Sequence, residues 1–260
     1  MRTTIQDLLK MKRDGRPIPV LTCYDYTSAK ILDSAGMPVL LVGDSLGMVV
    51  LGLDSTLPVT LDIMIHHCKA VARGTKDALI VLDLPFGTYS PADIPGSLRS
   101  AARALAEGGA QAVKIEGGAR MAPVVNALVG SGIPVMGHVG LTPQSIHQLG
   151  GYKMQGRDDL AKKRLIADCL ELESAGAFAV VLELLPNELS GQITSRLKIP
   201  TIGIGAGKDC DGQVQVFHDL FGLYEDFVPK HAKRFAHLGA AMRDAAKTYI
   251  ADVAARKFPD

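Results

Sequence analysis

Ionisable residues close five successive apolar runs of this sequence, and their types describe a candidate catalytic centre. In chain order they are Asp44, Asp83, Lys114 with Glu116, His138, and Glu183. Carboxylates without neighbouring cysteines suit a hard divalent cation, Mg²⁺ first. A lysine suits an anionic substrate, and an acid among apolar neighbours suits a general base. Any one of them could simply end a strand, whereas five consecutive runs ending this way predict one shared site.

The acids that follow three neighbouring runs are candidate metal ligands. Asp44 and Asp83 follow the second and third runs, and Glu116 follows the fourth. We interpret Asp44 and Asp83 as ligands of Mg²⁺. Glu116 is either a third ligand or the group that holds a metal-bound water. The alternative is that Asp44 and Asp83 cap the helices that come after them.

The remaining candidates suit substrate binding and proton transfer. Lys114 and Glu116 are two residues apart, so in a strand they point to the same face. Lys114 either neutralises the acids or holds a substrate's negative charge. His138 is either a structural hydrogen-bonding residue or a substrate contact. The apolar neighbours of Glu183 would partly desolvate it, which favours a general base, although a structural pairing with a lysine or backbone donor is the alternative.

Strand-like apolar runs alternate with helices along the chain. The predicted strands are 19–23, 39–44, 79–83, 112–118, 133–138, 178–183, 199–203 and 226–228. The predicted helices are 3–13, 27–35, 60–73, 94–107, 119–128, 158–174, 187–197 and 232–255. About eight such units favour a (β/α)₈ barrel with an N-terminal and a C-terminal helix, in one domain, 1–260. A barrel gathers its strand ends on one face, which would bring the ionisable residues together.

Composition excludes several other classes of protein. Of 260 residues 47% are hydrophobic and the formal net charge is +1, so neither a nucleic-acid nor a membrane surface is expected. No apolar run is long enough to cross a bilayer, and the N-terminus does not resemble a signal peptide. The four cysteines show no C-x-x-C spacing, which fits free thiols in a reducing compartment. We therefore expect a cytoplasmic protein.

Several long motifs resemble one family, the ketopantoate hydroxymethyltransferases. They occur in the family's order along nearly the whole chain: Val42–Gly47, Ser55–Thr60, Asp83–Gly87, Val113–Gly118, Gly137–Gln144, Gly150–Lys153, Gly203–Gly207 and Cys210–Val214. Leu84 departs from the methionine usual in the family, which is a swap between apolar residues of similar volume. The motifs are long and unrelated to one another, so the resemblance is specific.

The resemblance implies a Mg²⁺-dependent barrel enzyme of the pantothenate and coenzyme A pathway. Such an enzyme transfers a hydroxymethyl group from 5,10-methylenetetrahydrofolate to 3-methyl-2-oxobutanoate through an enolate, giving 2-dehydropantoate. It implies metal binding by Asp44, Asp83 and Glu116, and proton abstraction by Glu183. Substrate contacts would come from Asp44, Ser45, Asp83, Lys114 and His138. The family also implies a homo-oligomer, a decamer built as a pentamer of dimers.

Two other functions fit parts of the pattern. A Mg²⁺-dependent carbon–carbon lyase of the isocitrate-lyase or phosphoenolpyruvate-mutase type would share the acids and the enolate chemistry. Such enzymes usually carry a reactive cysteine in a K-x-C-G-H type motif, which this sequence lacks. A barrel that only binds a 2-oxo acid would not need the base Glu183. The glycine-rich segment Gly203–Gly207 is either a phosphate cradle or a tight turn that lines a pocket.

Overall fold

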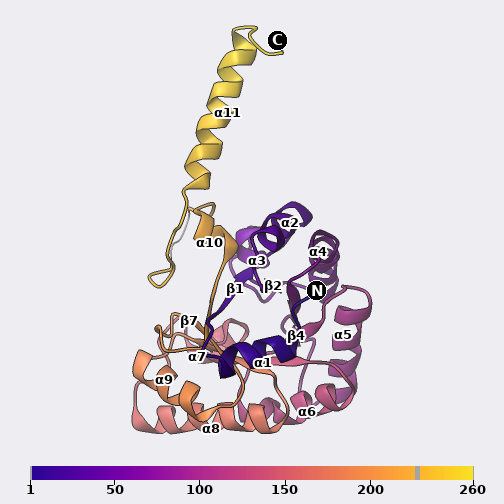
Figure 1. Cartoon of the computed structure of the whole chain (residues 1–260), viewed down its shortest axis with the longest axis vertical. Helices are drawn as coiled ribbons and strands as arrows, with labels where there is room; N and C mark the ends of the chain where they lie inside the picture. Colours follow the sequence, from indigo (N-terminus) through magenta and orange to yellow (C-terminus); the bar gives the residue numbers. More distant parts are fainter. Residues whose placement is uncertain (1, 226–228, 260) are drawn as a thin grey trace. The chain divides into compact units, whose positions relative to one another are not determined.

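A closed barrel of eight parallel strands forms the body of the protein (Figure 1). The computed structural model describes residues 2–225 and 229–259. The strands, each paired with the next along the chain, are β1 Ile18–Thr22, β2 Val39–Val42, β3 Leu79–Asp83, β4 Ala112–Lys114, β5 Val135–Gly140, β6 Ala179–Glu183, β7 Thr201–Ile204 and β8 Gly212–Gln215. The predicted (β/α)₈ barrel is confirmed.

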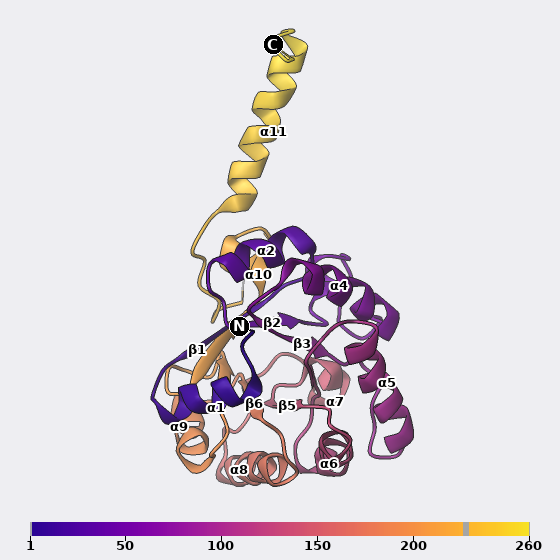
Figure 2. The ribbon, with the colours of Figure 1, turned by 45° about the vertical axis from the view of Figure 1, so that its right-hand side comes forward.

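Helices surround the barrel on its outer side (Figure 2). The helices that follow β1 to β6 are α2 Tyr26–Ser34, α3 Leu46–Val49 with α4 Leu61–Gly74, α5 Ile94–Ala106, η1 Ala119–Met121 with α6 Ala122–Gly130, η2 Pro143–Ser145 with α7 Ile146–Leu149 and α8 Asp159–Ser174, and α9 Asn187–Arg196. The connection from β7 to β8, residues 205–211, is described throughout and contains no helix. The alternation of strand and helix is therefore interrupted between β7 and β8.

Local sequence signals explain where several of these helices begin and end. The Thr4 hydroxyl accepts a hydrogen bond from the Asp7 N–H, and the Asp7 carboxylate accepts one from the Thr4 N–H, so a capping box starts α1 (Ile5–Arg13). Thr60 caps α4 in the same way through the Ile63 N–H. Gly36 lies just beyond α2 at φ +83°, a conformation that favours glycine at a helix end.

The barrel interior is apolar toward the N-terminal ends of the strands. A cluster of buried residues fills it, namely Leu8, Ile18, Val20, Val39, Leu41, Leu79, Val81, Ala112, Met136, Phe178, Ala179, Val181, Ile202 and Val214. Along β2 and β3 these members are two residues apart, as expected for side chains that share one face. Leu8 comes from α1, which packs against the cluster together with Ile5 and Met11. The predicted N-terminal helix is therefore part of the core.

Two predictions near the C-terminus need correction or stay open. The predicted eighth strand, 226–228, lies outside the described residues, and the barrel's eighth strand is Gly212–Gln215. That strand has only four residues and begins with Gly212. Glycine is required there because a Cβ would lie 2.3 Å from the Ile18 carbonyl oxygen. The predicted helix from 232 is wrong in its start, since α11 spans Leu238–Ala254.

The residues before α11 make other hydrogen bonds instead of helical ones. The Lys233 N–H donates to the Gln215 side chain at 2.7 Å, and the Phe235 N–H donates to the Leu220 carbonyl at 2.8 Å. These residues belong to a second compact unit, which begins at Gln215 and also contains α10 (Phe217–Phe221). The single domain, residues 1–260, stays a prediction. Among the described residues, no helix is both long and apolar enough to cross a membrane.

Candidate active site

Charged side chains occupy the inward face of the barrel two residues past its apolar core, toward the C-terminal ends of the strands. In β3, Val81 belongs to the core cluster, and Asp83 is the next residue on the same face. In β4, the core residue Ala112 is followed on its face by Lys114 and then by Glu116, just past the strand's end. The C-terminal rim of the barrel therefore continues the face that fills the interior, with charges in place of apolar groups.

Lys114 and Asp83 form a buried ion pair across two neighbouring strands. They are register partners in β3 and β4, and Lys114 Nζ lies 2.8 Å from Oδ1 and 2.7 Å from Oδ2 of Asp83. Burial lowers the pKa of Lys114, but the surrounding carboxylates, Asp83 first, outweigh this and raise it above its usual range. Burial raises the pKa of Asp83, and Lys114 offsets only part of that rise. The ammonium group is therefore permanently charged.

His138 lies between two acids from different strands. It is 2% exposed, and its Nδ1 lies 3.4 Å from Glu116 Oε1 while its Nε2 lies 3.1 Å from Glu183 Oε2. Burial and the Lys114 charge lower the pKa of His138, but the two carboxylates outweigh both and raise it to about 9. Burial raises the pKa of Glu116, and contact with His138 then lowers it overall. The two carboxylates thus favour the protonated form of His138, which lies between Glu116 and Glu183.

The backbone around Glu183 is strained and closely packed. Leu184 has φ +48°, in the left-handed region that bulky residues rarely adopt. Its N–H donates to the Ile204 carbonyl and its carbonyl accepts from the Gln155 N–H, each at 2.9 Å. A Cβ at Gly140 would lie 2.2 Å from the Glu183 carbonyl oxygen, so only glycine fits there. Strand β6 therefore ends at Glu183, next to this strained residue. The Glu183 side chain is 14% exposed.

Asp44 is buried beside two other acids. Burial first, and then the charges of Asp83 and Glu116, raise the pKa of Asp44 well above its usual range. Its Oδ2 accepts a hydrogen bond of 2.9 Å from Gln144 Nε2. The neighbouring Ser45 has its Oγ 2.9 Å from the Tyr24 hydroxyl oxygen. Asp44 therefore joins the cluster through Gln144, whereas Ser45 pairs with a tyrosine.

The acids of this cluster outnumber its cations. The acids are Asp44, Asp83, Glu116 and Glu183, and the cations are Lys114 and His138. Excess negative charge away from water is costly unless a further cation joins it. Among the described residues, no group of three or more His, Cys, Asp or Glu side chains is placed so that it could hold a metal ion. A bound cation would therefore need oxygen ligands from water or substrate as well, a mixed donor set that suits Mg²⁺.

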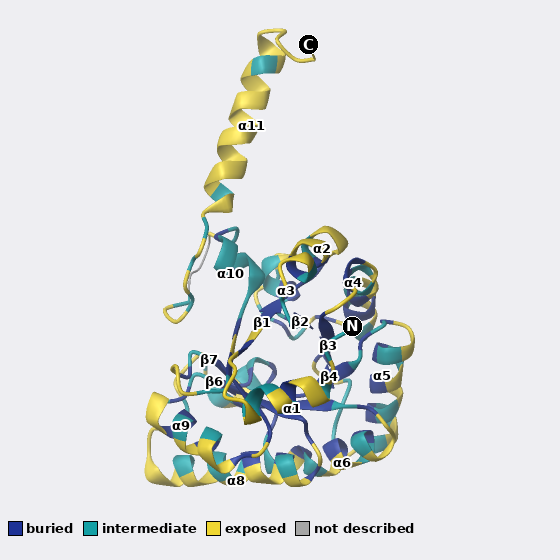
Figure 3. Ribbon diagram, in the orientation of Figure 1, coloured by how far each residue is buried: buried dark blue, intermediate teal, exposed yellow. Residues whose placement is uncertain are grey.

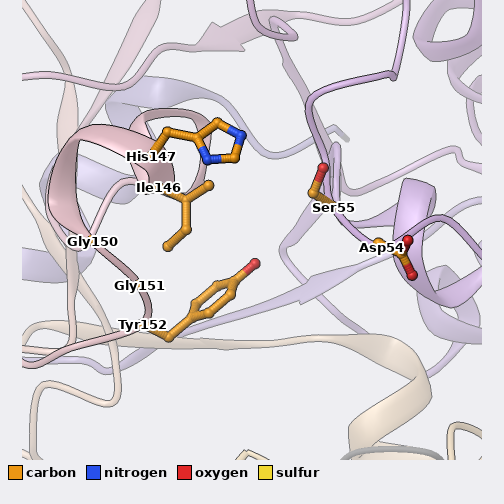
Figure 4. Close-up of a pocket in the computed structure, with 7 residues that line it drawn as sticks. All are labelled: Asp54, Ser55, Ile146, His147, Gly150, Gly151 and Tyr152. Carbon is orange, nitrogen blue, oxygen red and sulfur yellow. The ribbon is translucent and has the colours of Figure 1, made fainter.

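A pocket of about 440 Å³ lies between the loops that follow β2 and β5. Ile146, His147 and Tyr152 line one side of it and Asp54 and Ser55 the other (Figure 4). Burial and then the charges of the clustered acids raise the pKa of Tyr152, so its ring lies within electrostatic reach of them. Tyr152 therefore links the pocket electrostatically to the acid cluster.

Most of the residues predicted from sequence meet in this cluster. Asp83, Lys114, Glu116, His138 and Glu183 lie in a chain of direct contacts. The alternative that Asp44 and Asp83 cap helices is wrong, since the residues at the N-caps of α3 and α5 are Ser45 and Asp93.

Two polar residues of the cluster were missed by the sequence reasoning. Gln144 closes the motif Gly137–Gln144, and its closeness in sequence to the candidate site residue His138 was the available signal. Tyr89 lies in the loop after β3 and gave no signal, because its role depends on contacts with the distant residues Glu116 and Gln144.

A family model described as ketopantoate hydroxymethyltransferase matches residues 2–260 of this chain. The chain belongs to the ketopantoate hydroxymethyltransferase family. The 3-methyl-2-oxobutanoate hydroxymethyltransferase of Chloroflexus aurantiacus is 57% identical over 259 residues, covering 100% of this chain and 91% of the relative. The protein of the same name from Heliobacterium modesticaldum is 53% identical over 258 residues, covering 99% and 93%. The chain is therefore a hydroxymethyltransferase, as its motifs predicted.

Solved structures with a similar fold have much more distant sequences. A phosphonopyruvate hydrolase in complex with oxalate and Mg²⁺ aligns with a TM-score of 0.66 at 12% identity, covering 99% of this chain and 88% of that one. A 2,3-dimethylmalate lyase of the PEP mutase/isocitrate lyase superfamily aligns with a TM-score of 0.63 at 20% identity, covering 97% and 89%. At these identities this chain shares with them the barrel fold alone.

Proposed function

We propose that this enzyme transfers a hydroxymethyl group from 5,10-methylenetetrahydrofolate to 3-methyl-2-oxobutanoate, giving 2-dehydropantoate with Mg²⁺ as cofactor. Family membership supports the reaction. The observation that carries the mechanism is the rim cluster, in which the partly exposed Glu183 lies 3.1 Å from the buried cation His138. A carboxylate at the rim can accept a carbon-bound proton, and a positive charge close to it can stabilise the negative charge that develops on the substrate.

Asp44, Asp83 and Glu116 are the residues we assign to Mg²⁺. They fit because they are buried oxygen donors whose negative charge exceeds that of the nearby cations. Asp44 and Asp83 would be direct ligands, with Glu116 either a third ligand or the holder of a bound water. When bound, the ion supplies a Lewis acid that draws electron density from the keto oxygen of the substrate.

Lys114 and His138 supply the positive charge that holds the acidic substrate. The Lys114 ammonium has a proton available for a carboxylate beyond the two it directs at Asp83. His138 presents a second cation on the same face of the barrel. Asp44, Asp83 and Ser45 would complete the substrate contacts. Together these groups fix which carbon of the substrate faces Glu183.

Glu183 is the proposed general base. It takes the proton from C3 of 3-methyl-2-oxobutanoate, and the electron pair of that C–H bond becomes the C2–C3 double bond of the enolate. Water cleaves the two C–N bonds of the folate's methylene bridge, which gives formaldehyde and tetrahydrofolate. C3 then attacks the formaldehyde carbon as its C=O π bond opens, and the resulting alkoxide takes up a proton to become the hydroxyl group of the product. His138 holds the position of the Glu183 carboxylate. The exposure of Glu183 lets it return the proton to solvent.

A Glu183→Gln variant tests this assignment. We expect it to lose exchange of the C3 proton of 3-methyl-2-oxobutanoate with D₂O, followed by NMR, by about 10²-fold or more. Binding of the keto acid in the presence of Mg²⁺ should stay within about threefold, because the amide preserves the shape of the side chain. Glu188→Gln on α9 is the control for the same substitution at an exposed site. Exchange at the normal rate in Glu183→Gln would refute the base.

Cysteine chemistry of the lyase type finds no support at this site. Cys23, Cys68 and Cys169 are buried and free. Burial raises the pKa of the Cys23 and Cys68 thiols to about 12, which keeps them protonated and unreactive. Free thiols also fit the cytoplasm, which we propose as the compartment.

We also propose that the enzyme is a homo-oligomer, with α11 at a contact between copies. None of the residues of α11 is buried (Figure 3). Its large exposed apolar residues are Leu238, Met242, Tyr249, Ile250 and Val253. A stripe of this size at helical spacing is typical of a face that packs on a partner. Met242→Glu should lower the mass measured by light scattering, whereas the exposed Lys247→Glu should not.

A further inference from the structure

Gln144 uses every polar group of its side chain inside the acid cluster. It lies in η2 after β5 and is 5% exposed. Its Nε2 donates to Asp44 Oδ2 and to the Leu84 carbonyl, both at 2.9 Å. Its Oε1 accepts a hydrogen bond of 2.7 Å from the Tyr89 hydroxyl. A glutamine buried this completely, with its donors and acceptor all paired, has one orientation only.

The backbone of Gln144 binds a second acid from another strand. Its N–H donates to Glu116 Oε2 at 3.0 Å. The Glu116 N–H in turn donates to the Tyr89 hydroxyl oxygen at 2.9 Å. Gln144, Glu116 and Tyr89 thus form a closed ring of hydrogen bonds, and the Gln144 amide extends that ring to Asp44.

The direction of each hydrogen bond in this network is fixed by chemistry. A carbonyl can only accept, so the atom of Gln144 that faces Leu84 must be the amide nitrogen. The Tyr89 hydroxyl receives a hydrogen from Glu116 and must pass its own to Gln144 Oε1. Gln144 therefore presents a donor to Asp44 in every arrangement of the hydrogens. Lys114 donates hydrogen bonds to Asp83 and lies 3.8 Å from Glu116 Oε1, so the network covers the acids to which the lysine donates no hydrogen bond.

We propose that Gln144, held by Tyr89, is a positioning residue that aligns Asp44 and Glu116 and so sets the enzyme's affinity for a divalent cation. The proposal rests on the metal assignment made above for these acids. Groups that orient metal ligands change metal affinity by about 10–100-fold when removed. A role in packing alone would change stability and leave cation affinity unaltered.

Titration of the full-length protein with MnCl₂, with free Mn²⁺ followed by electron paramagnetic resonance, tests this proposal. Gln144→Met keeps the volume and the backbone bond to Glu116 but removes both donors, and we expect it to weaken Mn²⁺ binding about 10-fold or more. Tyr89→Phe removes one hydroxyl group and should weaken Mn²⁺ binding less than Gln144→Met does. In the double variant the loss should be smaller than the product of the single losses, because both side chains act through one network.

Gln148→Met, the same substitution at an exposed position of α7, is the matched control and should bind Mn²⁺ like the parent protein. Thermal unfolding in EDTA shows whether each variant is folded. If Gln144→Met distorts the fold, Tyr89→Phe still decides. Mn²⁺ affinity within twofold of the parent in both variants would overturn the positioning role. A parent protein that binds no Mn²⁺ would instead refute the metal assignment itself, and the inference with it.

Discussion

The two ends of the barrel use the same inward-facing positions for opposite purposes. At the N-terminal ends of the strands the positions are apolar, as in Val39 and Leu79, and Leu8 of α1 packs against them. At the C-terminal ends the face continues as Asp83 and Lys114. A step of two residues along a strand therefore separates the apolar core from the charged residues to which we assign the chemistry.

Charges at the two ends also have different partners. At the N-terminal end, Asp33 accepts hydrogen bonds from the N–H groups of Lys76, Asp77 and Ala78, the residues before β3. Those bonds stabilise its ionised form. At the C-terminal end, Asp44 lies beside further acids that destabilise its ionised form. The comparison implies that one end should lose stability when altered, and the other should lose activity without losing stability.

The largest expected effect is that of Asp44→Asn. Removing one proposed metal ligand should cost several kcal/mol of transition-state stabilisation, about 10³-fold or more in kcat/KM. In EDTA the same variant should melt at least about 2 °C higher, because one of the buried like charges is gone. Initial rates and thermal unfolding measure the two quantities. Asp62→Asn on the surface should change neither, and a metal-free Asp44→Asn that melts lower would contradict the comparison.

Leu8→Ala should show the reverse pattern. Leu8 is 0% exposed, so truncating it should lower the free energy of unfolding by about 2–5 kcal/mol through lost burial and a cavity. The rim lies on strand ends that Leu8 does not contact, so kcat per folded molecule should stay within about twofold. Urea unfolding and active-site-normalised rates give both values. Ile31→Ala, at a residue 59% exposed, should cost less than about 0.5 kcal/mol.

The sequence predicted the strand ends well because apolar runs and polar endings are local signals. Asp83 and Lys114 close runs that could hardly be anything but buried strands, and a barrel places such ends together. Gln144 and Tyr89 could not be found this way, since each works through residues distant in sequence. The eighth strand was missed because its sequence, one glycine, one valine and two glutamines, is not an apolar run. These residues form a strand because they pair with β7 and close the barrel.

The smallest expected effect concerns Asp33, and it depends on pH. Partial burial raises the pKa of Asp33, but its three N–H donors and the charge of Arg2 outweigh this and lower it below the usual aspartate range. An acid whose pKa is lower in the folded state stabilises the fold above its unfolded pKa of about 3.9. That contribution is lost as the pH falls below about 4 through the folded pKa.

Asp33→Ala should therefore lower the free energy of unfolding at pH 7 by about 1 kcal/mol, because it removes the acceptor of three backbone N–H groups, two of them at exposed residues that water can reach. The difference between Asp33→Ala and the parent should shrink as the pH falls from about 4 toward 2, in denaturant unfolding measured at each pH. Asp62→Ala removes a carboxylate that pairs with Arg103 at the surface and should cost under about 1 kcal/mol. A difference in the free energy of unfolding that stays constant through this pH range would mean that the charge of Asp33 does not contribute to stability. The two ends of the barrel would then differ in their packing and not in how they stabilise charges.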